Sequence, residues 1–177
     1  MIVEIEISDA NREEAQKINT LAGIVLPQNK TGLRATEIGF LGELIVGNYL
    51  DSLPHLNQLG NTVYHYDIIY KGFKIEVKSM NRFVKPLPNT DCCLTTYFSQ
   101  NCDIYVFVGI LNDKRKAWIK GWIDRKGFES KAKFIKAGTV RERDGFIYKW
   151  DNWIIQVKDL FPIETLKTIQ SKNLNLF

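Results

Sequence analysis

The sequence predicts a mixed α/β (α+β) fold in which a central mixed β-sheet is flanked by helices. Two strand-like runs within residues 64–80 surround a turn signal, and residues 103–111 form a near-continuous apolar run. Residues 33–50 are apolar on most sides, as expected of a helix buried against a sheet. Together these segments predict a sheet with at least one buried strand and a helix packed across it.

Length and composition fit one domain. The chain has 177 residues, of which 45% are hydrophobic and 12% aromatic, enough to form a substantial core. We expect the core of this domain at about residues 33–124, with peripheral elements at 1–32 and 125–177. The net charge of +4 is compatible with a phosphate-bearing partner but does not identify one.

The chain is expected to be soluble and cytoplasmic, without a membrane partner. Its first residues lack the basic segment of a signal peptide, and no apolar run approaches the roughly 18 residues of a membrane span. Cys92, Cys93 and Cys102 lack the paired spacing of a zinc site. We interpret them as buried thiols in a reducing compartment.

The first third of the chain alternates strand and helix signals. Residues 2–7 place apolar side chains on one side and acids on the other, which predicts a strand with one wet face. Ser8 or Asp9 then caps a helix expected to end at about Leu21. Less regular connections are expected at residues 22–32, 51–62 and 81–99, the last irregular or weakly helical.

The rest of the chain mixes strands and short helices. The apolar run at residues 103–111 predicts a strand buried on both faces, and a turn separates it from a strand at 115–124. Beyond these we expect a helix from about Gly127 to Ile135, strands near 146–149 and 153–157, and a helix from Phe161 or Pro162 to Ser171.

Residues 64–80 are expected to form a β-hairpin around Lys71-Gly72, because a two-residue connection containing Gly favours a tight turn. This turn pairs Tyr70 with Phe73, Ile68 with Ile75, and Asp67 with Glu76. Because side chains alternate along a strand, the pairing separates two faces. The core face carries Tyr66, Ile68, Tyr70, Phe73, Ile75 and Val77, and the polar face carries His65, Asp67, Ile69, Lys74, Glu76 and Lys78.

The polar face of the hairpin predicts a divalent cation site. Asp67 and Glu76 are expected directly opposite one another, where like charges repel. A hard ion such as Mg²⁺ compensates such repulsion, since it takes carboxylate and carbonyl oxygens, and Lys78 is expected beside it. His65 opposes Lys78 in this register. We interpret His65 as solvated or structural, with an indirect role behind the metal ligands as the alternative.

Glu43 is the candidate third acid of this site. Gly39, Glu43 and Gly47 recur every four residues and therefore share one helix face. The glycines are expected to permit close backbone approach, since each costs about 1 kcal/mol relative to Ala in a helix. Glu43 either pairs with a lysine or arginine, which the helix alone favours, or points toward Asp67 and Glu76.

Basic side chains are the candidates for binding a nucleic acid. Arg82 and Lys85 follow the hairpin, and the densest basic run comprises Lys131, Lys133, Lys136, Arg141 and Arg143. That run either follows a phosphate backbone or is a solvated surface. Trp118 and Trp122 are expected on one strand face with Lys120 between them. This arrangement can stack bases but is more typical of a core.

The combination of Asp67, the tripeptide Glu76-Val77-Lys78 and Glu43 on the preceding helix resembles the PD-(D/E)xK nuclease superfamily. The resemblance covers roughly residues 33–111 and implies a restriction-endonuclease-like core. The later segments GWID and GFESKAKF look like the periphery of small phage or bacterial members. Tyr66 stands where the name of the motif has proline, a position at which members often differ.

The resemblance also implies roles for individual residues. Asp67 and Glu76 would bind Mg²⁺, which Mn²⁺ can replace, together with the backbone carbonyl of Val77. Glu43 would bind metal through water or hold a second ion, and Lys78 would orient or help deprotonate the attacking water. Members often place a polar residue near Gln100, which is therefore a further candidate.

Two functions follow from this sequence. The leading hypothesis is a metal-dependent DNA endonuclease, with a Holliday-junction or branched-DNA resolvase as one form of it and a homodimer as the possible assembly. The alternative is a non-catalytic nucleic-acid-binding or assembly protein that retains the nuclease fold. Metal uptake distinguishes the two.

Overall fold

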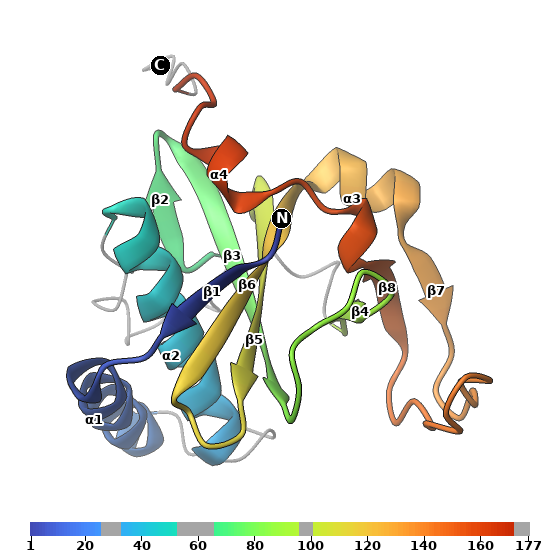
Figure 1. Cartoon of the computed structure of the whole chain (residues 1–177), viewed down its shortest axis with the longest axis horizontal. Coiled ribbons are helices and arrows are strands. Elements are labelled where there is room, and N and C mark those ends of the chain that lie inside the picture. The colour runs from blue at the N-terminus through green and yellow to red at the C-terminus, as the bar shows by residue number, and fades with distance from the viewer. Residues whose placement is uncertain (26–32, 53–65, 96–100, 172–177) are drawn as a thin grey trace.

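The computed structural model describes residues 1–25, 33–52, 66–95 and 101–171, and it has a mixed α/β architecture (Figure 1). Within the described residues, five strands form a central sheet in the order β1 (Val3–Glu6), β6 (Lys116–Asp124), β5 (Ile104–Leu111), β3 (Phe73–Arg82) and β2 (Ile68–Tyr70). Strands β3 and β5 are parallel, and the other neighbours are antiparallel. The prediction of a mixed α/β fold with a mixed sheet is therefore confirmed.

A second, smaller sheet stands beside the first. It contains β4 (Asp91–Leu94), β8 (Asn152–Gln156) and β7 (Lys133–Ile135), in that order. The described helices are α1 (Asp9–Val25), α2 (Leu33–Leu50), α3 (Arg125–Lys131), the 3-10 turn η3 (Val157–Asp159) and α4 (Ile163–Leu166). Figure 1 shows α1 and α2 on one side of the central sheet, and α3 and the second sheet on the other.

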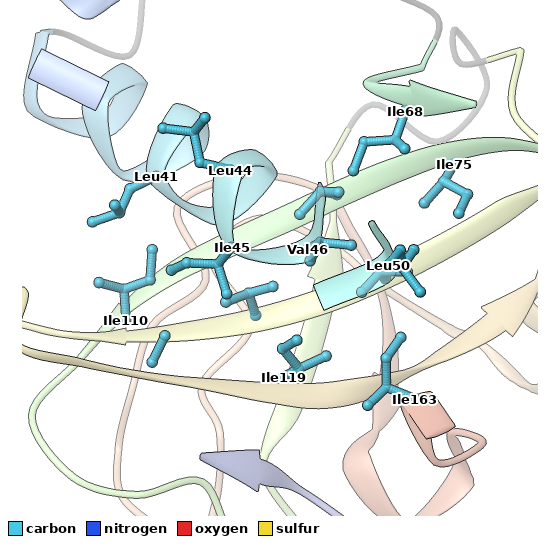
Figure 2. Packing of buried hydrophobic residues seen from close by; sticks show 14 of the residues in the cluster. Leu41, Leu44, Ile45, Val46, Leu50, Ile68, Ile75, Ile110, Ile119 and Ile163 are labelled. Carbon is cyan, nitrogen blue, oxygen red and sulfur yellow. The ribbon is translucent and has the colours of Figure 1, made fainter. Parts of the chain in front are cut away.

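Strand β5 separates the two cores of the protein, because its side chains alternate between the faces of the sheet. Ile104, Val106, Val108 and Ile110 belong to a cluster with Leu41 and Ile45 of α2, which we call the helix-side core (Figure 2). Tyr105 and Phe107 belong instead to a cluster with Cys92, Leu94, Ile123, Phe128 and Ile155, which we call the second-sheet core. The second sheet therefore covers the face of the central sheet opposite to α2.

The β2–β3 hairpin has the register that its turn predicts. Tyr70 pairs with Phe73 and Ile68 with Ile75. Lys71 and Gly72 both have positive φ, at 49° and 81°, as a two-residue hairpin turn requires. The Lys71 ammonium donates to the backbone carbonyl oxygens of Lys167, at 2.7 Å, and Ile169. The tip of the hairpin is thus tied to the segment that follows α4.

A β-bulge in β6 overturns the prediction that Trp118 and Trp122 share a face. Lys120 is the extra residue of the bulge, between the pairs made by Ile119 and Gly121. Ile119 and Trp122 both pack in the helix-side core, which strand residues three apart do only across a bulge. Trp118 and Trp122 therefore lie on opposite faces of the sheet.

Other expected elements match in part. Helix α1 begins as expected, with the Ser8 hydroxyl accepting a hydrogen bond from the Asn11 amide, but it runs to Val25. Part of the connection expected at residues 81–99 forms β4, and the end of the helix expected at 127–135 is β7. No strand forms at 146–149 among the described residues, where a single bridge joins Ile147 to Val140. The last helix is shorter than expected.

Within the described part of the chain, no helix is both long enough and apolar enough to cross a membrane. Cys92 and Cys102 are buried and Cys93 is half-buried, and all three are free thiols. Burial raises the pKa of Cys93 and of Cys102 to about 11. The thiols therefore stay protonated at neutral pH, in agreement with the expectation that they are buried.

Gly42 is the α2 glycine that sits against the sheet, whereas Gly39 has open space around it. A methyl group added at Gly42 would meet the Ser79 hydroxyl, with the Ser79 Cβ 3.0 Å away, but one added at Gly39 would meet nothing within 4 Å. The close approach predicted at Gly39 is therefore wrong. Close packing of α2 on β3 depends on Gly42 instead.

These two glycines give a matched test of helix packing. Gly39→Ala should stabilise the protein by up to about 1 kcal/mol, because alanine favours the helix and meets no neighbour. Gly42→Ala should destabilise it by about 1 to 3 kcal/mol, because Ser79 and the helix must move apart. Equilibrium unfolding in urea measures both changes. Equal effects of the two substitutions would contradict the packing of α2 described here.

Candidate functional site

Three acids from three separate elements meet at one place beside β3. Glu43 comes from α2, Asp67 from the bend that precedes β2, and Glu76 from β3. Burial raises the pKa of Asp67 well above its usual range, and the negative charges of Glu43 and Glu76 raise it further. The three acids therefore lie close enough for their charges to act on one another.

Asp67 reaches this place through a bend rather than through a regular strand pair. Strand β2 begins at Ile68, and the Asp67 amide donates to the Ile75 carbonyl at 2.8 Å. The Asp67 carboxylate accepts a hydrogen bond from the Val77 amide at 2.7 Å. In a regular strand pair, a backbone carbonyl of the neighbouring strand would accept this hydrogen bond instead. The predicted strand pair of Asp67 with Glu76 is therefore wrong in detail.

Glu76 and Lys78 lie on the face of β3 that looks toward the second sheet. Glu76 pairs with Tyr105 of β5 and Lys78 with Phe107, and those two aromatic residues belong to the second-sheet core. The Lys78 ammonium contacts the Glu76 carboxylate at 2.6 Å. Glu76 is only 5% exposed, whereas the side chain of Lys78 is 28% exposed. Lys78 thus extends from a buried acid toward solvent.

Glu43 shares the environment of these residues. Burial raises the pKa of Glu43 to about 7, the charge of Glu76 raises it as well, and the charge of Lys78 lowers it. Gly42 allows this approach, since its missing side chain lets α2 rest on Ser79 of β3. The charges of Glu43, Asp67 and Glu76 thus act on one another, and that Glu43 points toward the other two acids stays a prediction.

The donor chemistry of the site suits a divalent cation. Three carboxyl groups face one lysine, so the full ionisation of the acids leaves negative charge uncompensated. The Val77 amide donates to Asp67, and the carbonyl of a strand residue points to the same side as its amide. Asp67, Glu76 and the Val77 carbonyl therefore offer the oxygen ligands that Mg²⁺ prefers. As the side chains now lie, no group of three or more His, Cys, Asp or Glu within the described residues is arranged to hold a metal.

Two candidates fall outside the described residues, and two others have internal partners. His65 and Gln100 lie in the ranges that the structure does not describe. Arg82 ends β3 rather than lying in a loop, its guanidinium donates to the Asp91 carbonyl at 3.1 Å, and burial lowers its pKa. Lys85 is exposed and pairs with Glu4 at 3.4 Å. Arg82 therefore helps to join the two sheets.

Arg141 and Arg143 are held by acids of this chain. Both guanidinium groups contact the Asp91 carboxylate, at 2.6 and 3.1 Å, and Arg141 also contacts Asp144 at 2.7 Å. The hydrogen bond with Asp144, together with Asp91, raises the pKa of Arg141 above its usual range. The Tyr148 hydroxyl donates to the same Asp91 oxygen at 3.0 Å. These two arginines anchor residues 136–150 to β4.

Lys131 and Lys133 are exposed at the end of α3 and at the start of β7. The Lys131 ammonium lies 3.5 Å from the Asp159 carbonyl and 5.5 Å from the centre of the Phe161 ring. Of the basic run, these lysines are on the surface as expected, whereas the arginines are part of the internal network.

Sequence reasoning missed Asp91 and the burial of Lys120. Asp91 is 7% exposed and receives three side-chain donors from residues at least 50 positions away, which no local pattern predicts. Lys120 is 3% exposed, and burial lowers its pKa. The only local signal for Lys120 is Gly121, whose φ of 143° accompanies the bulge.

Comparison with known proteins gives no match for this chain, either among the models of protein families or among curated proteins.

Asp91 should contribute more to stability than a neighbouring acid that binds the same arginine. Asp91→Asn should destabilise the protein by about 2 to 3 kcal/mol, because it weakens hydrogen bonds to charged groups in a buried place. Asp144→Asn should cost less than about 1 kcal/mol, since its side chain is 45% exposed. Urea unfolding compares the two. If Asp144→Asn cost as much as Asp91→Asn, the anchoring role of Asp91 would be wrong.

Proposed function

We propose that this protein is a Mg²⁺-dependent DNA endonuclease with a restriction-endonuclease-like core of the PD-(D/E)xK type. The observation that carries the proposal is the meeting of Glu43, Asp67 and Glu76 beside Lys78. A fold does not gather acids of like charge in buried and half-buried positions for stability, since their desolvation and repulsion are unfavourable. A site that must hold a cation explains them.

The arrangement of elements supports the same conclusion. Helix α2 carries Glu43, the β2–β3 hairpin carries Asp67, Glu76 and Lys78, and the buried strand β5 runs parallel to β3. This is the order of elements that the sequence resemblance implies: a helix with an acid, an acid before one strand, and an E-x-K tripeptide on the next. The whole chain would then form one nuclease domain.

In this proposal Asp67, Glu76 and the Val77 carbonyl hold Mg²⁺ or Mn²⁺, and Glu43 acts through water or on a second ion. A bound divalent ion acts as a Lewis acid, lowers the pKa of its water and offsets charge on the phosphate. Lys78 would orient the attacking water, and its positive charge would stabilise the phosphate oxygens as the water oxygen bonds to phosphorus and the bond from phosphorus to the leaving sugar oxygen breaks. The proton lost by the water balances the one that the leaving oxygen takes up from solvent. The Val77 amide holds Asp67 in place through its hydrogen bond.

The partner in this proposal is DNA. The acid site itself repels phosphates, so a cation and basic side chains must bring the substrate close. Cutting both strands of a duplex would require two copies of the site, and we propose a homodimer for that case. The proposed nuclease could act as a branched-DNA or Holliday-junction resolvase, and a panel of DNA substrates tests this form of the activity directly.

Divalent metal should stabilise the wild-type protein through these acids. Adding Mn²⁺ or Mg²⁺ should raise the Tm of wild type, because ligands that bind only the folded state stabilise it. Asp67→Asn and Glu76→Gln should abolish most of this rise. In EDTA the Glu43→Gln variant should be at least as stable as wild type, since it removes a buried charge. Differential scanning fluorimetry with and without EDTA measures both effects.

The control for metal binding is Asp144→Asn, which removes an exposed acid far along the chain and should keep the full metal-induced rise in Tm. If Mn²⁺ stabilised wild type and the Asp67→Asn and Glu76→Gln variants equally, or bound to none of them in calorimetry, the metal site would be wrong. DNA binding without any metal uptake would then favour the non-catalytic nucleic-acid-binding protein.

Cleavage should depend on the same residues. With Mg²⁺, wild type should cut at least one of linear, flapped or four-way DNA substrates. Asp67→Asn, Glu76→Gln and Lys78→Ala should each lower the rate by about 100-fold or more, since each removes charge stabilisation in the transition state. Lys74→Ala is the matched control, because it changes another lysine of β3 and should retain activity. Equal cutting by all variants would identify a contaminating nuclease and exclude the proposal.

A further inference from the structure

The net positive charge of the chain is concentrated in residues 131–150, which we call the basic segment. It contains six lysines and arginines and two acids, a net charge of +4. The whole chain also has a net charge of +4, so outside the segment the eighteen basic residues are balanced by eighteen acidic ones. The basic segment is therefore the part of this protein that attracts a polyanion at long range.

The lysines of the basic segment remain at its surface, whereas its arginines are used internally. Arg141 and Arg143 are paired with Asp91 and Asp144. Lys133, Lys136 and Lys149 are exposed. Ion pairs thus fix the shape of the segment, and its lysines supply the charge that faces outward.

Large apolar side chains are exposed between these lysines. Trp150 is 70% exposed, Phe134 50% and Phe146 49%, while Val140 and Ile147 are more than half exposed and form a bridge. The Phe146 ring has neighbours that orient it, because it packs edge-on against Tyr148 and the Arg141 guanidinium lies 4.9 Å from its centre. Exposed aromatic groups between cations are unfavourable in water and therefore indicate a binding surface.

The basic segment lies on the same side of the central sheet as Glu76 and Lys78 of the proposed site. Glu76 and Lys78 project from the face of β3 that the second sheet covers, and β7 and β8 belong to that second sheet. Phe134 of β7 packs against Trp153 of β8, with ring centres 5.3 Å apart. Phe134, one of the exposed rings, is therefore carried by an edge strand of the sheet that covers this face.

We propose that the basic segment binds an unpaired DNA strand, with Phe146 and Trp150 stacking on bases and the exposed lysines binding phosphates. This inference rests on the proposed function and names its substrate class: DNA that has a single-stranded part beside the bond to be cut. Bases of a duplex are stacked on one another and do not offer their faces to aromatic rings. A basic surface for duplex alone would need lysines and arginines but no exposed tryptophan.

The test is binding of fluorescein-labelled oligothymidine and of a duplex of equal length to the full chain, measured by fluorescence anisotropy in EDTA so that nothing is cut. Wild type should bind the single strand more tightly than the duplex. Trp150→Ala should weaken binding of oligothymidine roughly five-fold or more, whereas Trp150→Phe should keep most of the affinity, since phenylalanine still stacks. Phe83→Ala is the control, because Phe83 is 80% exposed but outside the basic segment.

The lysines give a second measurement. Changing Lys133 and Lys149 together to Gln should reduce the slope of log affinity against log salt concentration by about 0.7 for each phosphate that the variant no longer neutralises. Lys17→Gln, which removes an exposed lysine of α1, should leave the slope unchanged. Thermal unfolding of each variant checks that the fold is intact. If Trp150→Ala lowers the Tm, the salt dependence of the variant with Gln at both Lys133 and Lys149 tests the inference instead.

The outcomes separate this inference from the proposed function. If Trp150→Ala and the lysine pair bind oligothymidine as wild type does, or if duplex is bound as tightly as single strand, the inference is overturned while cleavage through Asp67 and Glu76 remains possible. If no DNA is cut but the single strand is bound as expected, the proposed activity fails and the inference stands. Binding of the segment to vesicles containing phosphatidylserine, without binding to oligothymidine, would also overturn it.

Discussion

The main constraint on this structure is the placement of three like-charged side chains against one strand, with Glu76 buried and Glu43 and Asp67 half-buried. Glu43 and Asp67 both have raised pKa values, because burial and the charges of their neighbours disfavour ionisation. The same arrangement cannot exist unless other interactions hold it together. Those interactions are the helix-side core on one face of β3 and the second-sheet core on the other, between which β5 is buried along almost its whole length.

Three independent features of the fold bring the acids close together. The two-residue turn at Lys71-Gly72 sets the register of β2 and β3, so Asp67 arrives near Val77. The close approach of Gly42 to Ser79 brings α2 onto β3 and carries Glu43 with it. The alternation of side chains along β3 puts Glu76 and Lys78 on one face. Each feature is supported by apolar packing or backbone hydrogen bonds, which offset the repulsion that the acids create.

Local sequence patterns predicted the elements that position the acids. Helix α2 was predictable from its composition, the hairpin from its turn, and β5 from its apolar run, because each signal is contained in a few neighbouring residues. The bulge at Lys120 was not predictable, since one extra residue in β6 changes no local pattern but reverses the faces of Trp118 and Trp122.

Long-range ion pairs were the other limit of sequence reasoning. Arg141 and Arg143 looked like free cations in a basic run, but Asp91, about fifty residues earlier, holds both. Similarly, close packing was expected at Gly39 and Gly47, but Gly39 has open space and Gly42 meets the sheet, because the rotation of a helix about its axis depends on the whole core. The sequence therefore shows which residues are charged, but not which distant residue each charged side chain pairs with.

The charges of this protein are divided between two places, and this division fits the chemistry proposed for it. The acids that would hold a metal repel a phosphate backbone, so they cannot also anchor the substrate. The basic segment has the opposite charge, and the Asp91 network fixes its shape without using its lysines. Under the proposed function, anchoring and chemistry could be altered separately: removing a lysine of the segment would change how strongly DNA is held, whereas removing an acid beside β3 would change the rate at which it is cut. The second sheet contributes to both places, because β4 and β8 share a core with Tyr105 and Phe107 whereas β7 belongs to the basic segment.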